Sequence, residues 1–161
     1  MKRPIQLTES EWAHTKLAEW ANPEDISVLL IEASTDDAKD IMQAMTYGEP
    51  LYNFKIIQKD SLMEGINFLK TSKVDVILLD LNIPDAKEHE AIEVIHGLFP
   101  ELPIVVMSTT SNIETAHQAF KSGAQECLNK EECNSTTLRQ SIYQALYRKK
   151  VDLSYQRGEK L

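Results

Sequence analysis

The chain has 161 residues, a hydrophobic fraction of 42% and a formal net charge of −8 at pH 7. This length and composition fit one folded domain with short extensions rather than a disordered chain. The negative charge argues against non-specific binding to nucleic acid, which needs clustered Lys and Arg. No apolar run approaches the ~20 residues of a membrane span, and no N-terminal stretch resembles a signal peptide. Because the only cysteines, Cys127 and Cys133, form no CxxC motif, we expect a reduced, cytoplasmic setting.

The first 25 residues predict a helical extension ahead of the main domain. Thr8 to Glu11 has the spacing of a capping box, which predicts a helix over residues 9–21. One face of that helix carries an apolar stripe that includes both tryptophans of the chain: Trp12, Ala13, Lys16, Leu17 and Trp20. We favour packing of this stripe on the chain's own domain, and the alternative is a contact in a homodimer.

Strand-like and helical segments alternate along the rest of the chain. The pattern predicts strands at residues 26–32, 54–58, 74–80, 103–108 and 124–129. Helices are predicted at residues 35–47, from Ser61 onward, near 88–98, from Ser111 or Asn112 to 121, and at 136–150. This order predicts an α/β fold, in which helices wind around both faces of a five-stranded parallel sheet. The domain then spans residues 26–148, followed by a polar tail over residues 149–161. The basic run Arg148-Lys149-Lys150 predicts the last turn of the final helix, and we expect residues 151–161 to fray.

Charged or hydroxyl side chains end four of the predicted strands. Residues 76–79 are apolar without a break, as in a strand buried on both faces, and Asp80 follows directly. Asp80 either caps the turn over residues 81–85 or serves a ligand site at the carboxyl edge of the sheet. Glu32, Ser108 and Lys130 end three other strands and are expected to converge with Asp80. This set favours a carboxylate nucleophile beside a divalent cation, with Ser108 and Lys130 stabilising phosphoryl oxygens.

The same segments resemble the receiver domain of two-component response regulators. The resemblance rests on residues 28–32 (VLLIE), 80–85 (DLNIPD), 104–108 (IVVMS) and 123–130 (GAQECLNK). It implies a flavodoxin-like sheet of order 2-1-3-4-5 and a phosphoacceptor role for Asp80. It further implies that Lys130 pairs with Asp80 or with the phosphoryl oxygens, and that Ser108 moves toward the acyl phosphate. Mg²⁺ is the implied cofactor, held by Asp80, by the backbone carbonyl of Asn82, and through water by Glu32.

The resemblance also implies partners. A histidine kinase or a phosphotransfer protein would donate the phosphoryl group, and the signal would pass to a downstream protein or to an output domain. The domain would be a signalling module rather than an enzyme, with at most Mg²⁺-dependent self-phosphorylation and autodephosphorylation. We expect no nucleic-acid or membrane partner, and a homodimer stays open.

Three positions depart from the family pattern. Ala33 stands where receivers usually carry a second acid that touches Mg²⁺, Cys127 where they carry a switch aromatic, and Glu131 where Pro is frequent. Asp36 or Asp37 could supply the missing acid, although a role at the start of the helix is favoured for both.

Two alternative functions therefore stand beside a phosphorylated receiver. The runner-up is a pseudo-receiver, an interaction module that is not phosphorylated because its metal site lacks one acid. An aspartyl-phosphate hydrolase is disfavoured, because Asn82 stands where such enzymes usually carry a second Asp.

Overall fold

Five parallel strands form one sheet in the order β2-β1-β3-β4-β5. The computed structural model of the chain describes residue 8 and residues 25–46, 53–87, 89–109 and 112–158. The strands are β1 (Asp25–Ile31), β2 (Asn53–Lys59), β3 (Val76–Asp80), β4 (Ile104–Ser108) and β5 (Glu126–Asn129). The parallel sheet and its strand order are confirmed, and the predicted helix over residues 9–21 lies outside the described residues.

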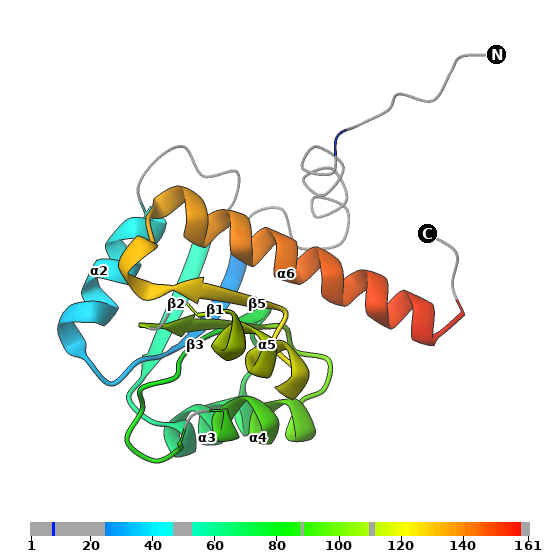
Figure 1. Cartoon of the computed structure of the whole chain (residues 1–161), viewed down its shortest axis with the longest axis horizontal. Helices are drawn as coiled ribbons and strands as arrows, with labels where there is room; N and C mark the ends of the chain where they lie inside the picture. The colour runs from blue at the N-terminus through cyan, green and yellow to red at the C-terminus, as the bar shows by residue number, and fades with distance from the viewer. Residues whose placement is uncertain (1–7, 9–24, 47–52, 88, 110–111, 159–161) are drawn as a thin grey trace.

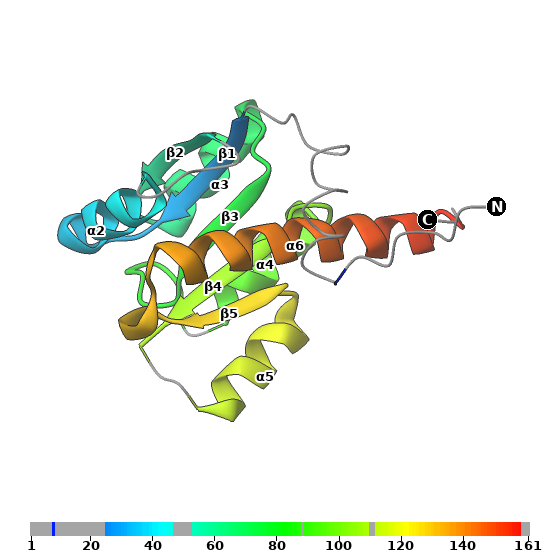
Figure 2. The same cartoon turned by 90° about the horizontal axis from the view of Figure 1, so that it is seen from above.

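Helices cover both faces of this sheet, as Figures 1 and 2 show. They are α2 (Thr35–Thr46), α3 (Leu62–Thr71), α4 (Glu90–Leu98), α5 (Ile113–Ser122) and α6 (Ser135–Gln156), with a 3₁₀ turn η1 (Lys130–Glu132). Buried side chains of α2 and α6 pack on one face, and those of α3, α4 and α5 pack on the other. No described helix is long and apolar enough to cross a bilayer.

The unbroken apolar run in β3 is explained by burial on both faces. Successive side chains of a strand point to opposite faces of the sheet. Leu78 accordingly joins the core under α2 and α6, whereas Ile77 and Leu79 join the core under α3 and α4. All five residues of β3 are buried, Asp80 included, so the strand delivers a carboxylate directly to the edge of the core.

Side-chain caps determine where the helices begin. The Ser61 hydroxyl accepts a hydrogen bond from the amide of Glu64 at 3.2 Å, as the capping-box spacing predicts. Asn112 caps α5 through the amide of Thr115 at 2.7 Å. Asn134 and Thr137 form a reciprocal capping box at the start of α6.

The last helix extends beyond its predicted end at residue 150 and continues to Gln156. The expectation that the chain frays from residue 151 is therefore wrong for residues 151–156. The basic run Arg148-Lys149-Lys150 predicted the last turn of this helix. Instead, it lies inside the helix, and the side chain of Lys149 is buried at 8% exposure. The helix ends before Gly158, whose φ of +70° is incompatible with a right-handed turn.

Candidate functional site

The carboxyl edge of the sheet brings the predicted site residues together. Glu32 follows β1, Asp80 ends β3, Ser108 ends β4 and Lys130 follows β5. Because the strands are parallel, all four lie at the same edge. The Nζ atom of Lys130 lies 3.0 Å from Asp80 Oδ2 and 2.8 Å from Glu32 Oε2. Three of the four residues are therefore in direct contact.

Asp80 is buried at 2% exposure and both of its carboxylate oxygens have a partner. Oδ1 accepts a hydrogen bond from the amide of Asn82 at 3.1 Å, and Oδ2 accepts one from Lys130 Nζ at 3.0 Å. The amide of Leu81 donates to the carbonyl of Met107 at 3.1 Å, which ties the residue after Asp80 to β4. Asp80 therefore stabilises its own turn, as the capping alternative requires, and also faces the largely buried ammonium of Lys130.

Glu32 is the most deeply buried acid of the site, at 1% exposure. Its Oε1 accepts a hydrogen bond from the amide of Ser34 at 3.0 Å. Its Oε2 faces the Lys130 ammonium as an ion pair and accepts no hydrogen bond from the described residues. Burial raises the pKa of Glu32 against the lowering effects of Lys130 and the Ser34 amide, and nearby Asp80 raises it further.

Lys130 contacts a third acid that the sequence did not single out as its partner. Asp37 Oδ2, in the first turn of α2, lies 2.7 Å from Lys130 Nζ, and the Asp37 amide is capped by the Ser34 hydroxyl at 3.2 Å. The carboxylate of Asp37 thus pairs with Lys130, whereas the helix-start role was the one favoured from the sequence. Burial opposes the charge on Lys130, but the close contacts with the Asp37, Glu32 and Asp80 carboxylates outweigh this effect and raise the pKa of Lys130.

The loop after Asp80 is held by a second acid with no assigned role in the sequence. The carboxylate of Asp85 accepts hydrogen bonds from the amides of Leu62 at 2.8 Å and Met63 at 2.9 Å, at the start of α3. Desolvation is the largest single effect and raises the pKa of Asp85, but the hydrogen bonds from these two amides and from its own amide together lower it. Asp85 thereby anchors the Asp80 loop to a neighbouring helix.

An open cavity of about 620 Å³ gives access to Asp80. Asn82, His89, Ser108 and Thr109 line it together with Asp80. Ser108 is buried and lies in register with Asn129, the residue before Lys130. Ser108, at the end of β4, and Asn82, two residues after the end of β3, therefore share this cavity with the buried carboxylate.

The acids of the site are gathered around the Lys130 ammonium rather than arranged as metal ligands. Across the described ranges, no group of three His, Cys, Asp or Glu side chains is arranged to hold a metal. The carboxylates of Glu32, Asp37 and Asp80 converge on the Lys130 ammonium instead. Ala33 contributes no oxygen beyond its backbone, and the half-buried Cys127 lies in β5 beside Val106 of β4.

Comparison with known proteins places the chain in a family. The model of the response regulator receiver domain matches residues 21–143. LuxO of Vibrio vulnificus is 32% identical over 83 residues, which cover 52% of this chain and 18% of LuxO. The cell cycle transcriptional regulator CtrA of Caulobacter vibrioides is 32% identical over 103 residues, 64% of this chain and 43% of CtrA. The chain thus matches less than half the length of either relative.

Solved structures agree with this placement. The receiver domain assigned to a LuxO repressor of Vibrio parahaemolyticus has a TM-score of 0.68 and 25% identity, over 80% of this chain and 95% of that one. A CheY-like receiver domain protein of Methanospirillum hungatei has a TM-score of 0.67 at 16% identity, over 79% of this chain and 98% of that one, which supports the fold alone. The chain belongs to the response regulator receiver domain family.

Proposed function

We propose that Asp80 accepts a phosphoryl group from a phosphohistidine of a histidine kinase or phosphotransfer protein, and that the domain then signals through protein contacts. The observation that carries this proposal is the ion pair between Lys130 Nζ and Asp80 Oδ2 at 3.0 Å, beside an open cavity. A nucleophile that is buried, paired with a cation and reachable from solvent suits in-line phosphoryl transfer.

The proposed phosphoryl transfer is a substitution at the phosphorus atom of the donor. An oxygen of the Asp80 carboxylate forms a P–O bond while the P–N bond of the donor breaks, and the bonding electron pair returns to the imidazole of the donor. The transition state is loose, with charge on the equatorial phosphoryl oxygens. Lys130 can stabilise that charge, and the Ser108 hydroxyl lines the same cavity from β4.

Charge balance favours the binding of a cation from solution at this site. Glu32, Asp37 and Asp80 carry three negative charges against one positive charge on Lys130. A phosphorylated side chain carries about two negative charges instead of one, which increases the imbalance. The residues fit Mg²⁺, because its preferred ligands are hard oxygens and three carboxylates here face a single ammonium. Glu32, Asp80 and the Asn82 carbonyl would hold the ion, which would supply charge to the phosphoryl oxygens.

The proposed output of the domain is a contact with another protein or domain. We expect a downstream protein or an output domain to read the phosphorylated state in the cytoplasm. The catalytic capacity of the domain would be limited to its own phosphorylation and dephosphorylation. A homodimer is one form that the output contact could take.

Intact mass spectrometry tests the proposal. Wild-type protein incubated with Mg²⁺ and acetyl phosphate should gain one phosphoryl group, and Asp80→Ala should gain none. Asp36→Asn is the matched control, because Asp36 is an exposed acid in the first turn of α2 and should leave the adduct intact. An adduct of equal yield in Asp80→Ala would overturn the assignment.

One observation favours a second candidate, the pseudo-receiver. Position 33 is Ala, and Lys130 is already held by three carboxylates, so the site can be stable without metal or phosphate. This candidate predicts no adduct at any Mg²⁺ concentration, together with partner binding that is unchanged in Asp80→Asn.

A further inference from the structure

An apolar groove lies at the amino edge of the sheet, opposite Asp80. The ends of α3 and α4, the segments that lead into β3 and β4, and the second half of α6 enclose a cavity of about 670 Å³. Leu69, Val74, Leu98, Leu146 and Leu153 are among its lining residues. Leu98 is 56% exposed, so the groove presents an aliphatic side chain to solvent. Grooves of this kind bind other protein segments.

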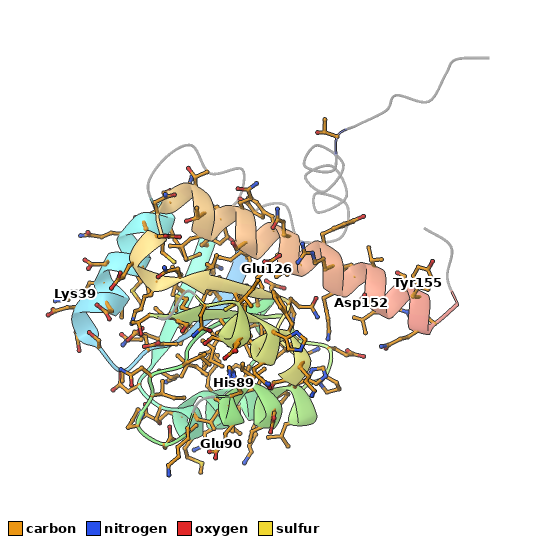
Figure 3. The ribbon with its side chains drawn as sticks, viewed as in Figure 1. Lys39, His89, Glu90, Glu126, Asp152 and Tyr155 are labelled. Atoms are coloured by element: carbon orange, nitrogen blue, oxygen red, sulfur yellow. The ribbon has the colours of Figure 1, made fainter. Side chains whose placement is uncertain are left out.

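The part of α6 that borders this groove lies outside the family match. The match ends at residue 143, whereas α6 continues to Gln156 and extends past the sheet (Figures 1 and 2). Figure 3 labels Asp152 and Tyr155 on this extension. Lys149 and Ser154 are only 8% and 7% exposed there. Polar residues near the end of a projecting helix are ordinarily solvated, so this part of α6 is not exposed to solvent on all sides.

The chain ahead of β1 starts beside the same groove. The amide of Ser27, near the start of β1, donates to Asp75 Oδ2 at 2.8 Å, and the amide of Asp75 donates to the Ser27 carbonyl at 2.9 Å. Asp75 is a lining residue of the groove. Only residues 22–24 separate the predicted helix over residues 9–21 from β1, and three residues span at most about 10 Å. Residue 21 is therefore tethered by a short link to this edge of the sheet.

The charges of the two surfaces are complementary. Residues 9–21 contain three acids, Glu9, Glu11 and Glu19, and one basic residue, Lys16. The groove is lined by three lysines, Lys73, Lys149 and Lys150, and two acids, Asp75 and Glu101. An acidic amphipathic segment thus starts next to an apolar groove with a basic excess.

We propose that residues 9–21 dock in this groove as an amphipathic helix, with Trp12, Leu17 and Trp20 against its leucines. Both parts that extend beyond the family match, the N-terminal segment and the second half of α6, then cover each other. This contact is independent of phosphorylation at Asp80, which lies at the opposite edge of the sheet. It leaves the groove closed to a second copy or to another protein.

Tryptophan fluorescence of the full chain tests the proposal, because the chain has only two tryptophans and both lie in this segment. We expect the emission to be blue-shifted from that of solvated indole and weakly quenched by iodide, at any protein concentration. Leu153→Asp in the groove should shift the emission to the red and increase quenching. Val94→Asp is the matched control, since Val94 is 40% exposed on α4 and is not a lining residue of the groove.

Circular dichroism checks that the Leu153→Asp and Val94→Asp variants remain folded. Leu17→Asp changes the other side of the same proposed contact, in residues 9–21. It should shift the emission as Leu153→Asp does. Wild-type emission like that of free indole overturns the proposal, and so does emission unchanged by Leu153→Asp. A blue shift that disappears on dilution, together with a dimer in light scattering, would assign the groove to a second copy instead.

Discussion

Lys130 Nζ lies 2.7 Å from Asp37 Oδ2, closer than its 3.0 Å separation from Asp80 Oδ2. A carboxylate from the first turn of α2 thus joins Glu32 and Asp80 at the Lys130 ammonium. Asp37 is 45% exposed, whereas the Lys130 side chain is 14% exposed, so the contact joins a surface acid to a largely buried ammonium. Asp37 therefore sets part of the electrostatic balance of the site.

Removal of the Asp37 charge should weaken Mg²⁺ binding. Asp37→Asn lowers the excess negative charge by one, and loss of one such charge in a water-like dielectric should cost a bound divalent ion about 1 kcal/mol, or roughly fivefold in affinity. Calorimetric titration with MgCl₂ measures this. Asp36→Asn is the control for charge alone at the surface, and equal Mg²⁺ affinity in Asp37→Asn and wild type would contradict the prediction.

Glu32 should make stability fall as pH rises above the acidic range. Its pKa is raised in the folded protein from an ordinary 4.5, so the folded state binds more protons than the unfolded state between the two values. The stabilisation is complete below 4.5 and is lost as pH rises through the raised pKa. Urea unfolding from pH 4 to pH 8 should show this negative slope in wild type and a flatter one in Glu32→Gln. Parallel slopes would exclude Glu32 as the source.

Asp85 should stabilise α3 and the Asp80 loop together. Asp85→Ala leaves the Leu62 and Met63 amides without their carboxylate, and loss of such a cap costs about 1 kcal/mol. Because the pKa of Asp85 is lowered below its ordinary 3.8, its contribution is present above that pH and is lost as pH falls through the lowered value. Urea unfolding at pH 7 and pH 3 should therefore separate Asp85→Ala from wild type more at pH 7. A constant difference would contradict this account.

Two glycines provide a matched pair for backbone strain. Gly123 closes α5 with φ +122°, and a Cβ there would lie 2.6 Å from Cγ of His96. Gly97, inside α4, has no atom within 4 Å of its Cβ position. Gly123→Ala should cost about 2 kcal/mol in unfolding free energy, whereas Gly97→Ala should stabilise by about 0.5–1 kcal/mol. Thermal unfolding measures the stability change of each variant. Destabilisation by Gly97→Ala would contradict the open space found around the Cβ position of Gly97.

Much of the fold could be predicted because the strongest sequence signals are local and periodic. The apolar run over residues 76–79 marks a strand buried on both faces, and the predicted strand ends agree with the structure within two residues. Asp80, Glu32 and Lys130 could be grouped because parallel strands all end at one edge. This geometric rule needs no knowledge of side-chain rotamers.

The contacts that were missed depend on the choices of individual side chains. Asp37 can cap its own helix or reach Lys130, and only the tertiary structure decides between them. Asp85 bonds amides of α3 that lie 23 and 22 residues away, which no local pattern encodes. The basic run Arg148-Lys149-Lys150 predicted a helix end, but α6 continues to Gln156 and the side chain of Lys149 is buried. Cations near a helix end are only a local signal, and tertiary packing overrides it here.

The central claim is tested most directly with phosphoramidate, a small donor whose P–N bond resembles that of phosphohistidine. Wild-type protein with Mg²⁺ should gain one phosphoryl group by intact mass, located by peptide mapping at Asp80, and EDTA should suppress the gain. Asp80→Asn should gain none. No adduct in the wild type at high Mg²⁺, or an adduct mapped away from Asp80, would contradict the account.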